Sequence, residues 1–226
     1  MTQVNQASGN MRSGEEYLRS LNDGRHVYAD GELVRDVTTH PAFREAAKSM
    51  AHLFDVAAAP EHREVMTYPS PRTGAPVWRA WQIPRSHADL RAKRLAAEKW
   101  AEQTFGLMGR TPDHVAGFIA GYAAKPGLFA AGGQRFADNL LKIYEDLRDN
   151  HRYVTYAIVP PQIDRSKPAH QQKDPTLHAG VVKERDDGIV ISGAQQLATA
   201  GVFADYLHLS ASTRCAPATR PMPTAW

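Results

Sequence analysis

The sequence predicts an α+β protein, with helices over roughly the first two thirds of the chain and short strands after them. Up to about residue 150, apolar residues recur at helical spacing. Beyond that point, β-prone runs alternate with turn residues around one long polar loop. The hydrophobic fraction of 42% and the charged fraction of 23% are typical of a folded chain with a core. We therefore expect a mainly helical domain over residues 1–150 and the first part of a β domain over 151–210.

Start signals mark the helices of the first domain. Ser13 and Glu16 form a capping box, which predicts a short helix through Leu21. Proline is favoured in the first turn of a helix, so Pro41 predicts a second helix that starts at Thr39-His-Pro41 and runs to about Val56. Further helices are expected over 86–105, 111–124 and 134–150, the middle one capped by Thr111-Pro-Asp113.

Strands are expected in both parts of the chain. Asp30-Gly31 is a type I′ hairpin signal between two short β-prone runs. A Pro/Gly-rich turn joins strand candidates at 65–68 and 77–83. In the β domain the candidates are 153–159, 177–183, 188–192 and 203–209, with a polar loop over 160–175. A β domain with only these few strands would leave strand edges exposed. We therefore expect the β domain to be incomplete.

Charge, cysteine content and missing motifs exclude several classes of protein. The formal net charge of +3 is too small to predict binding to nucleic acid or an anionic membrane. The chain lacks an apolar run long enough for a transmembrane helix, and its polar start lacks a signal-peptide pattern. Cys215 is the single cysteine, and no P-loop, dinucleotide, zinc or serine-nucleophile motif is present. We expect a cytoplasmic protein with no metal and no nucleic-acid or membrane partner.

Two segments carry candidate chemistry. In the segment 106–114, Arg110 precedes a helix N-terminus, where a phenolate or carboxylate would be attracted. An ordinary surface arginine beside a helix cap fits the same residues. In the segment 155–174, prolines stiffen a loop rich in polar side chains, which suits a large polar ligand such as a flavin. A solvated interdomain linker fits that composition equally well.

These two segments, together with 36–43, 187–194 and 197–200, resemble the 4-hydroxyphenylacetate 3-hydroxylase family in order and spacing. The resemblance covers roughly residues 11–210. It implies an acyl-CoA-dehydrogenase-like fold, with an N-terminal helical domain, a middle β-barrel and a C-terminal helical bundle that builds a homotetramer. We expect the bundle to be missing from this chain and the barrel to be interrupted.

The resemblance also implies a reaction and its participants. A separate flavin reductase would supply reduced FAD, and the oxygenase would use it with O₂ to hydroxylate a phenolic acid such as 4-hydroxyphenylacetate ortho to its hydroxyl group. By resemblance, Arg110 holds the phenolic oxygen, with His114 and Tyr156 beside it. The residues implied for flavin contacts are Gln162, Asp164, Arg165, Pro168, Ala169, His170, Gln171 and Thr199.

Two positions depart from the family pattern. His114 stands where the familiar form of the motif has tyrosine, and Tyr156 stands where it has histidine. Both residue types hydrogen-bond a phenolic oxygen, but their charge and reach differ. A related phenolic or amino-aromatic acid is therefore as good an expectation for the substrate as 4-hydroxyphenylacetate. The related 4-hydroxybutyryl-CoA dehydratases need several cysteines for an iron–sulfur cluster, and Cys215 is the single one here.

The segment 211–226 resembles nothing in the family. It holds the lone cysteine and no acidic residue, and back-translation in a shifted frame yields a family-like continuation. We expect a frameshifted tail, and a truncated chain that binds FAD weakly or not at all and tends to aggregate. Two alternatives stay open: a non-catalytic helical binding or interaction module derived from the same fold, and a flavin-using acyl-CoA dehydrogenase relative.

Overall fold

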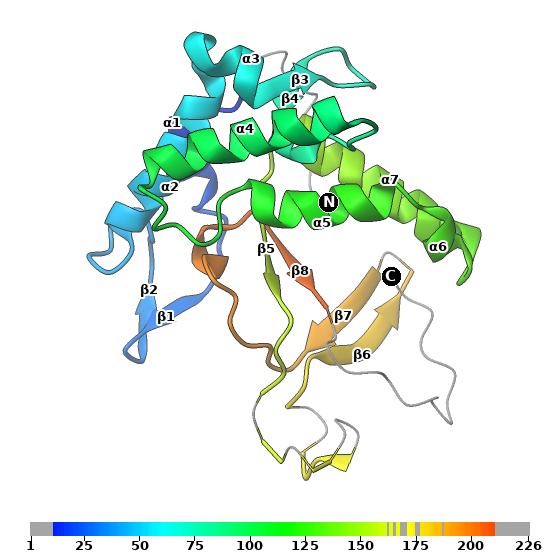
Figure 1. Ribbon diagram of the computed structural model, residues 1–226. Coiled ribbons are helices and arrows are strands. Elements are labelled where there is room, and N and C mark those ends of the chain that lie inside the picture. The colour runs from blue at the N-terminus through cyan, green and yellow to red at the C-terminus, as the bar shows by residue number, and fades with distance from the viewer. Residues whose placement is uncertain are drawn as a thin grey trace. The chain divides into compact units, whose positions relative to one another are not determined.

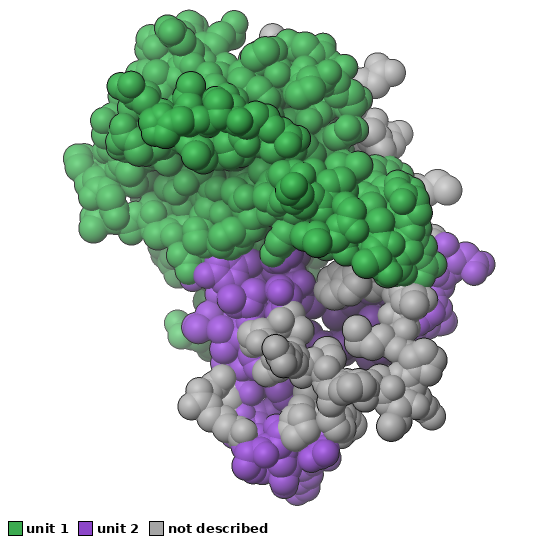
Figure 2. Space-filling model, turned by 45° about the vertical axis from the view of Figure 1, so that its right-hand side comes forward, with its two compact units in different colours: residues 1–155, 200–206 green, residues 156–199, 207–226 purple. Residues whose placement is uncertain are grey.

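The computed structural model describes residues 11–161, 163–164, 166–167, 171–174, 177–186 and 188–210 (Figure 1). The chain forms two compact units (Figure 2). Unit 1 comprises Met1–Thr155 with Ala200–Tyr206, and unit 2 comprises Tyr156–Thr199 with Leu207–Trp226. Unit 1 therefore contains the helical region and also the short segment Ala200–Tyr206 from late in the chain.

Unit 1 is built from helices and two small hairpins. Its α-helices are α1 (Gly14–Ser20), α2 (Arg44–Ala58), α3 (Arg63–Met66), α4 (His87–Gln103), α5 (Asp113–Ala123), α6 (Gly127–Ala130) and α7 (Gln134–Asp149). Its antiparallel hairpins are β1 (Val27–Ala29) with β2 (Glu32–Val34) and β3 (Thr67–Pro69) with β4 (Pro76–Trp78). Short 3₁₀ turns lie at Pro60–His62, Arg79–Trp81 and Gly201–Phe203.

The remaining strands pair two at a time. β5 (Val154–Ala157) pairs with β8 (Tyr206–Leu209), and both strands cross the boundary between the units. β6 (Gly180–Arg185) and β7 (Gly188–Ser192) form an antiparallel hairpin with a register shift at Val181/Lys183. The structure is thus a mixture of helix and sheet, and its described strands close no barrel.

Two of the local signals of the first domain are confirmed. The Ser13 hydroxyl accepts the Glu16 N–H, and the Glu16 carboxylate accepts the Ser13 N–H, so the capping box opens α1. Asp30 and Gly31 have φ values of 53° and 83°, as a type I′ turn requires at both central positions. These features depend on neighbours in sequence, which is why the pattern predicted them.

Several expected elements differ from the structure. In the strand expected over 65–68, Val65 and Met66 belong to α3, and the strand expected over 203–209 begins at Tyr206. The second helix begins at Arg44 rather than near Thr39. Before it, the Asp36 carboxylate accepts hydrogen bonds from the Thr38 N–H and hydroxyl, at 2.8 and 2.7 Å. These bonds hold a turn that competes with the helix. The strand expected over 77–83 ends at Trp78, because the next three residues form a 3₁₀ turn.

Aromatic residues form the centre of the core of unit 1. Tyr17 stacks on Phe54 with ring centroids 4.2 Å apart, and Phe54 meets the edge of Trp78 at 4.8 Å. Trp100 is fully buried and donates its indole N–H to the Leu53 carbonyl at 2.9 Å. The packing of these rings and the hydrogen bond of the Trp100 indole join α1, α2, β4 and α4 in one core.

A buried carboxylate lies at the end of α7. Asp149 accepts hydrogen bonds from Ser70 Oγ at 2.8 Å and from Arg72 Nε and Arg148 Nε, both at 2.7 Å. Burial alone would raise the pKa of Asp149, but these donors outweigh it and lower the pKa. The carboxylate stays ionised and ties α7 to the turn between β3 and β4.

None of the described helices is both long enough and apolar enough to cross a membrane.

Candidate active site

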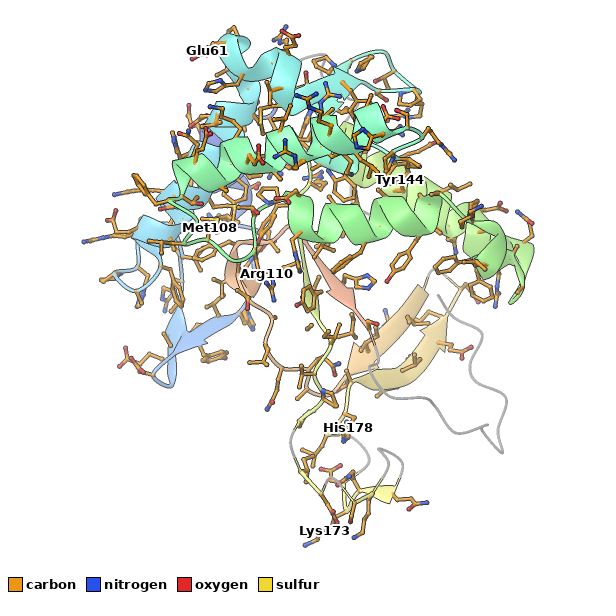
Figure 3. The ribbon with its side chains drawn as sticks, viewed as in Figure 1. Glu61, Met108, Arg110, Tyr144, Lys173 and His178 are labelled. Carbon is orange, nitrogen blue, oxygen red and sulfur yellow. The ribbon has the colours of Figure 1, made fainter. Side chains whose placement is uncertain are left out.

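Arg110 lies in the loop that joins α4 to α5 (Figure 3). Its side chain is half-buried, and Nη1 donates to the Gly109 carbonyl at 2.7 Å. The carbonyl of Arg110 accepts a hydrogen bond of 2.8 Å from the hydroxyl of Tyr153. The loop therefore presents a cation just before a helix N-terminus, a place where an anionic oxygen is stabilised.

The start of α5 differs from the predicted cap. Pro112 occupies the N-cap position, and no side chain caps the helix there. Thr111 contributes its carbonyl instead, which accepts the His114 N–H at 3.1 Å. Asp113 lies in the first turn, where its negative charge complements the helix dipole.

His114 lies in the first turn of α5 and is half-buried. Its ring meets the edge of Phe118 with centroids 5.0 Å apart. Burial lowers the pKa of His114, the neighbouring Arg110 lowers it further, and Asp113 opposes both. The imidazole is therefore neutral near pH 7 and offers one donor and one acceptor nitrogen.

The third residue expected around the phenolic oxygen belongs to the other unit. Tyr156 is half-buried in β5 and is the first residue of unit 2. Arg110 and His114 belong to unit 1 and lie within one turn of each other along the chain.

The described part of the expected flavin loop is held by internal hydrogen bonds. Gln172 is buried and donates its side-chain amide to the carbonyls of Asp164 and Lys167, at 2.7 and 2.9 Å. The Asp164 carboxylate accepts the Ser166 N–H and hydroxyl at 3.0 and 2.6 Å. Hydrogen bonds from Ser166 and the ammonium of Lys167 lower the pKa of Asp164.

The other residues expected to contact flavin divide into two groups. Gln171 and Thr199 are exposed in unit 2, and Thr199 directly precedes Ala200, which has a φ of 61°. The remaining five lie outside the described residues: Gln162, Arg165, Pro168, Ala169 and His170.

Two residues that organise these loops were not predicted from the sequence. Gln172 holds the loop around Asp164, and Tyr153 contacts Arg110 across 43 positions. Neither residue belongs to a motif with a recognisable spacing. For Gln172 the available signal was a glutamine within a proline-rich loop, and for Tyr153 it was an aromatic residue entering a strand.

The sequence profile described as "4-hydroxyphenylacetate 3-hydroxylase N terminal" matches residues 13–221. The chain belongs to the 4-hydroxyphenylacetate 3-hydroxylase family. The match confirms the resemblance inferred from the motifs. It also extends over 211–221, which is part of the segment expected to be unlike the family.

Characterised relatives are similar over most of this chain. The oxygenase component of 4-hydroxyphenylacetate 3-monooxygenase from Klebsiella oxytoca is 40% identical over 195 residues, which are 86% of this chain and 36% of the relative. The oxygenase component of 4-nitrophenol 2-monooxygenase from Rhodococcus is 39% identical, over 83% of this chain and 35% of the relative. The chain thus spans little more than a third of the length of these family members.

Solved structures agree with this assignment. The oxygenase component of 4-hydroxyphenylacetate 3-monooxygenase, in complex with FAD and 4-hydroxyphenylacetate, matches with a TM-score of 0.75 and 36% identity. The match covers 82% of this chain and 38% of that chain. An archaeal 4-hydroxybutyryl-CoA dehydratase from N. maritimus has a TM-score of 0.78 at 25% identity, covering 92% of this chain and 41% of that one. The fold of this chain is therefore found both in an oxygenase component and in a dehydratase.

Proposed function

We propose that this chain forms the N-terminal part of an aromatic hydroxylase that uses reduced FAD and O₂ to hydroxylate a phenolic acid ortho to its hydroxyl group. The observation that carries the proposal is the likeness, at 36% identity, to an oxygenase component crystallised with FAD and 4-hydroxyphenylacetate. The words "oxygenase component" in the names of the relatives support a separate flavin reductase as partner. A homotetramer of the complete enzyme is part of the same proposal.

In this proposal Arg110 holds the phenolic oxygen and favours its anionic form. A guanidinium supplies charge-assisted hydrogen bonds to such an oxygen, and a phenolate ring is richer in electrons than a phenol ring. His114 would hydrogen-bond the same oxygen as a neutral imidazole, since burial and Arg110 lower its pKa. Tyr156 would supply a further hydroxyl.

The polar loop of unit 2 would hold the flavin. The described part of the loop offers the Asp164 carboxylate as acceptor and the Gln171 amide as donor, and Thr199, later in unit 2, offers a hydroxyl. Gln162, Arg165, Pro168, Ala169 and His170 are proposed to contribute to the same contacts. Bound reduced FAD would supply the activation of O₂, and the chain's residues would position the phenolic ring beside it.

The substrate is proposed as a phenolic or amino-aromatic acid. His114 and Tyr156 exchange the residue types of the familiar motif, so the hydrogen-bond donors around the phenolic oxygen differ in charge and reach. A relative named for 4-nitrophenol supports a range of para-substituted phenols within the family.

Binding of 4-nitrophenol tests the role of Arg110, because the phenolate absorbs visible light and the phenol does not. We expect the protein to raise the phenolate fraction of bound 4-nitrophenol, and Arg110→Ala to weaken binding about tenfold or more. Arg91→Ala, an exposed arginine of α4, is the matched control and should bind as wild type does. Equal binding by wild type and Arg110→Ala would contradict the proposal, and no binding by either would favour a non-catalytic helical module.

For the 226-residue chain by itself, we propose weak flavin binding and impaired turnover. β6 pairs with β7 and with no other described strand, and Val181, Val182 and Ile191 are exposed. Such edges and apolar faces favour aggregation. Anaerobic titration with reduced FAD measures the binding, and later addition of O₂ and a phenolic acid measures turnover; tight binding with stoichiometric hydroxylation would contradict the proposal.

We also propose a shifted reading frame within residues 211–226, although the match of the family profile up to residue 221 argues against a shift at the start of this segment. Sequencing the gene past the codon for Ser210 tests this directly. A gene with no family-like continuation in another frame would contradict it.

A further inference from the structure

Tyr153 connects the core of unit 1 to the loop that carries Arg110. Its side chain is fully buried, and its hydroxyl donates to the Arg110 carbonyl at 2.8 Å. Burial raises the pKa of Tyr153, so the hydroxyl keeps its proton and remains a donor throughout the physiological range. A hydrogen bond from a rigid core side chain therefore ends on the backbone of the proposed substrate-binding residue.

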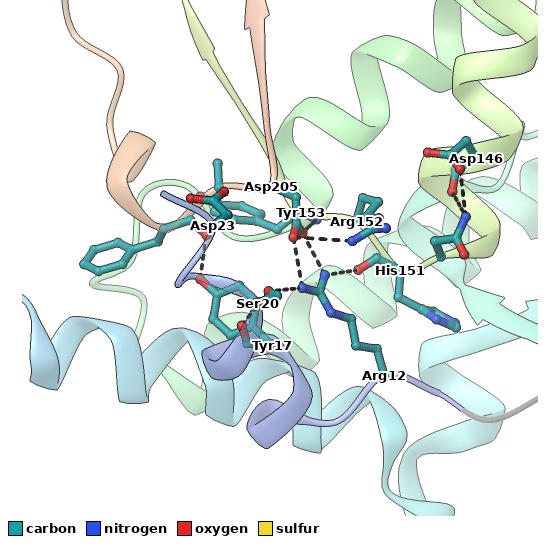
Figure 4. Close-up of polar contacts among 12 residues, drawn as sticks. Arg12, Tyr17, Ser20, Asp23, Asp146, His151, Arg152, Tyr153 and Asp205 are labelled. Carbon is teal, nitrogen blue, oxygen red and sulfur yellow. Dashed lines mark hydrogen bonds and ion pairs between the residues drawn. The ribbon is translucent and has the colours of Figure 1, made fainter. Parts of the chain in front are cut away.

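The backbone of Tyr153 is itself fixed by Asp205 (Figure 4). The Tyr153 N–H donates to Asp205 Oδ2 at 2.8 Å, and the Asp205 N–H donates back to the Tyr153 carbonyl at 2.9 Å. This reciprocal pair holds the start of β5 against the segment that leads into β8. Both residues belong to unit 1.

Asp205 is held in turn by arginines. Arg12 donates to both carboxylate oxygens of Asp205, at 2.8 and 2.9 Å, and Arg152 lies 3.8 Å from Asp205 Oδ1. Arg12 also donates to the His151 carbonyl at 3.3 Å and contacts the Ser20 hydroxyl. The side chains of Arg12 and Asp205 are 10% and 7% exposed, so this frame is shielded from water and salt.

The loop before Arg110 needs such an anchor. Phe105 and Leu107 are 89% and 87% exposed, so their side chains add little packing. Phe105 and Gly106 have φ values of 52° and 71°, and the N–H groups of Gly106 and Leu107 bond only back to the end of α4 among the backbone contacts of the described residues. A loop of this kind is mobile unless its far end is tied to the core.

We propose that Tyr153 is a positioning residue for Arg110: through its hydroxyl it fixes the Arg110 backbone, and Asp205 with Arg12 holds Tyr153 in place. This inference rests on the proposed phenolate-binding role of Arg110. A site that binds an anion gains affinity when its cation is ordered before the ligand arrives, because less conformational entropy is lost on binding. Tyr153 would thus act on the substrate through Arg110 and without touching it.

The first test needs no ligand. Tyr153→Phe removes the hydroxyl and keeps the ring, and we expect faster amide deuterium exchange in peptides covering 104–112 with unchanged exchange in α2. Tyr144→Phe is the matched control, because Tyr144 is also buried in unit 1 and donates to the Trp81 carbonyl at 2.7 Å. Tyr144→Phe should leave exchange in 104–112 as in wild type. Wild-type exchange there in Tyr153→Phe would overturn the inference.

The second test is a double-mutant cycle with 4-nitrophenolate. Tyr153→Phe should weaken binding about fivefold, the value of one ordinary hydrogen bond, and should have no further effect in an Arg110→Ala background. An equal effect in both backgrounds would show a general structural role and would overturn the inference. If wild type binds no 4-nitrophenolate, the proposed phenolate-binding role of Arg110 fails for this chain, and the deuterium exchange alone decides whether Tyr153 anchors the loop.

Discussion

Arg12 and Asp205 lie 193 positions apart in the sequence and form a bidentate ion pair, with Nη1–Oδ2 and Nη2–Oδ1 distances of 2.8 and 2.9 Å. The pair fastens the segment before α1 to the segment that returns to unit 1 just before β8. Because both side chains are largely buried, removing one partner leaves the other charge uncompensated.

Asp205→Asn should therefore lower the free energy of unfolding by about 3 kcal/mol. The amide has the shape of the carboxylate but lacks its charge, and it cannot accept from Arg12 at both positions. Urea unfolding followed by circular dichroism measures the change. Asp23→Asn is the control, because Asp23 is 46% exposed beside Arg25 and its loss should cost less than about 1 kcal/mol. Similar losses in the two variants would contradict this prediction.

Gly14 is required where α1 meets α2. A Cβ atom at Gly14 would lie 2.5 Å from both the Ala51 carbonyl oxygen and Asp55 Oδ2. Gly14→Ala would also disturb the hydrogen bond of 2.7 Å from its N–H to Asp55 Oδ1. We expect a loss of about 2 kcal/mol in the free energy of unfolding, typical of overpacking.

The control for Gly14 is a helical glycine with free space. At Gly121 in α5, a Cβ atom would meet no neighbouring atom within 4 Å, so Gly121→Ala should stabilise the protein by up to about 1 kcal/mol through helix propensity. Thermal unfolding of the two variants gives shifts of opposite sign. A stabilised Gly14→Ala would show that α1 and α2 are less closely packed than described.

His151 makes stability depend on pH. It is 4% exposed, and its Nε2 lies 3.1 Å from the Pro76 carbonyl, to which it donates. Burial lowers the pKa of His151, although the Pro76 carbonyl opposes this effect. The unfolded chain therefore binds a proton at higher pH than the folded protein does. The contribution of His151 to the free energy of unfolding is fully present above its pKa in the unfolded chain, about 6.5. It is lost as the pH falls towards the pKa of His151 in the folded protein.

Unfolding in urea at about pH 7.5 and about pH 5.5 should show wild type losing up to about 1 kcal/mol at the lower pH through His151. His151→Asn should reduce this loss, since asparagine does not titrate and tolerates the φ of 49° found there. Buried carboxylates such as Asp149 titrate below this window. An unchanged pH dependence in His151→Asn would assign the loss to other histidines with lowered pKa, namely His114 and His208.

Gln172 should control the order of the proposed flavin loop. Gln172→Glu keeps the shape but replaces an amide donor with a carboxylate facing the carbonyls of Asp164 and Lys167. We expect faster deuterium exchange over 163–174 and weaker binding of any ligand that needs the ordered loop. Gln171→Glu, an exposed neighbour with the same charge change, should leave the exchange unchanged. Equal exchange in both variants would show that Gln172 does not hold the loop.

Local features were predictable wherever their causes lie within a few residues. Ser13 and Glu16 satisfy each other across three positions, and Asp30-Gly31 sets its own turn. Helix α7 was also expected from its periodicity; Tyr144 and Leu147 are buried, whereas Leu141 and Ile143 are 37% and 38% exposed. Periodicity identifies a face of a helix, but the neighbouring elements decide how much of that face is covered.

The sequence by itself predicted helices α1, α2, α4, α5 and α7, the turns of the hairpins β1–β2 and β3–β4, the family, and the candidate residues Arg110, His114 and Tyr156. Only the tertiary structure decided what holds Arg110: Tyr153 contacts its backbone, and Arg12 and Asp205 hold Tyr153 in turn. Short-range signals arise from backbone geometry that repeats every few residues, and they can be read in one window. Contacts between distant residues depend on which elements the core brings together, and no spacing in the sequence encodes them.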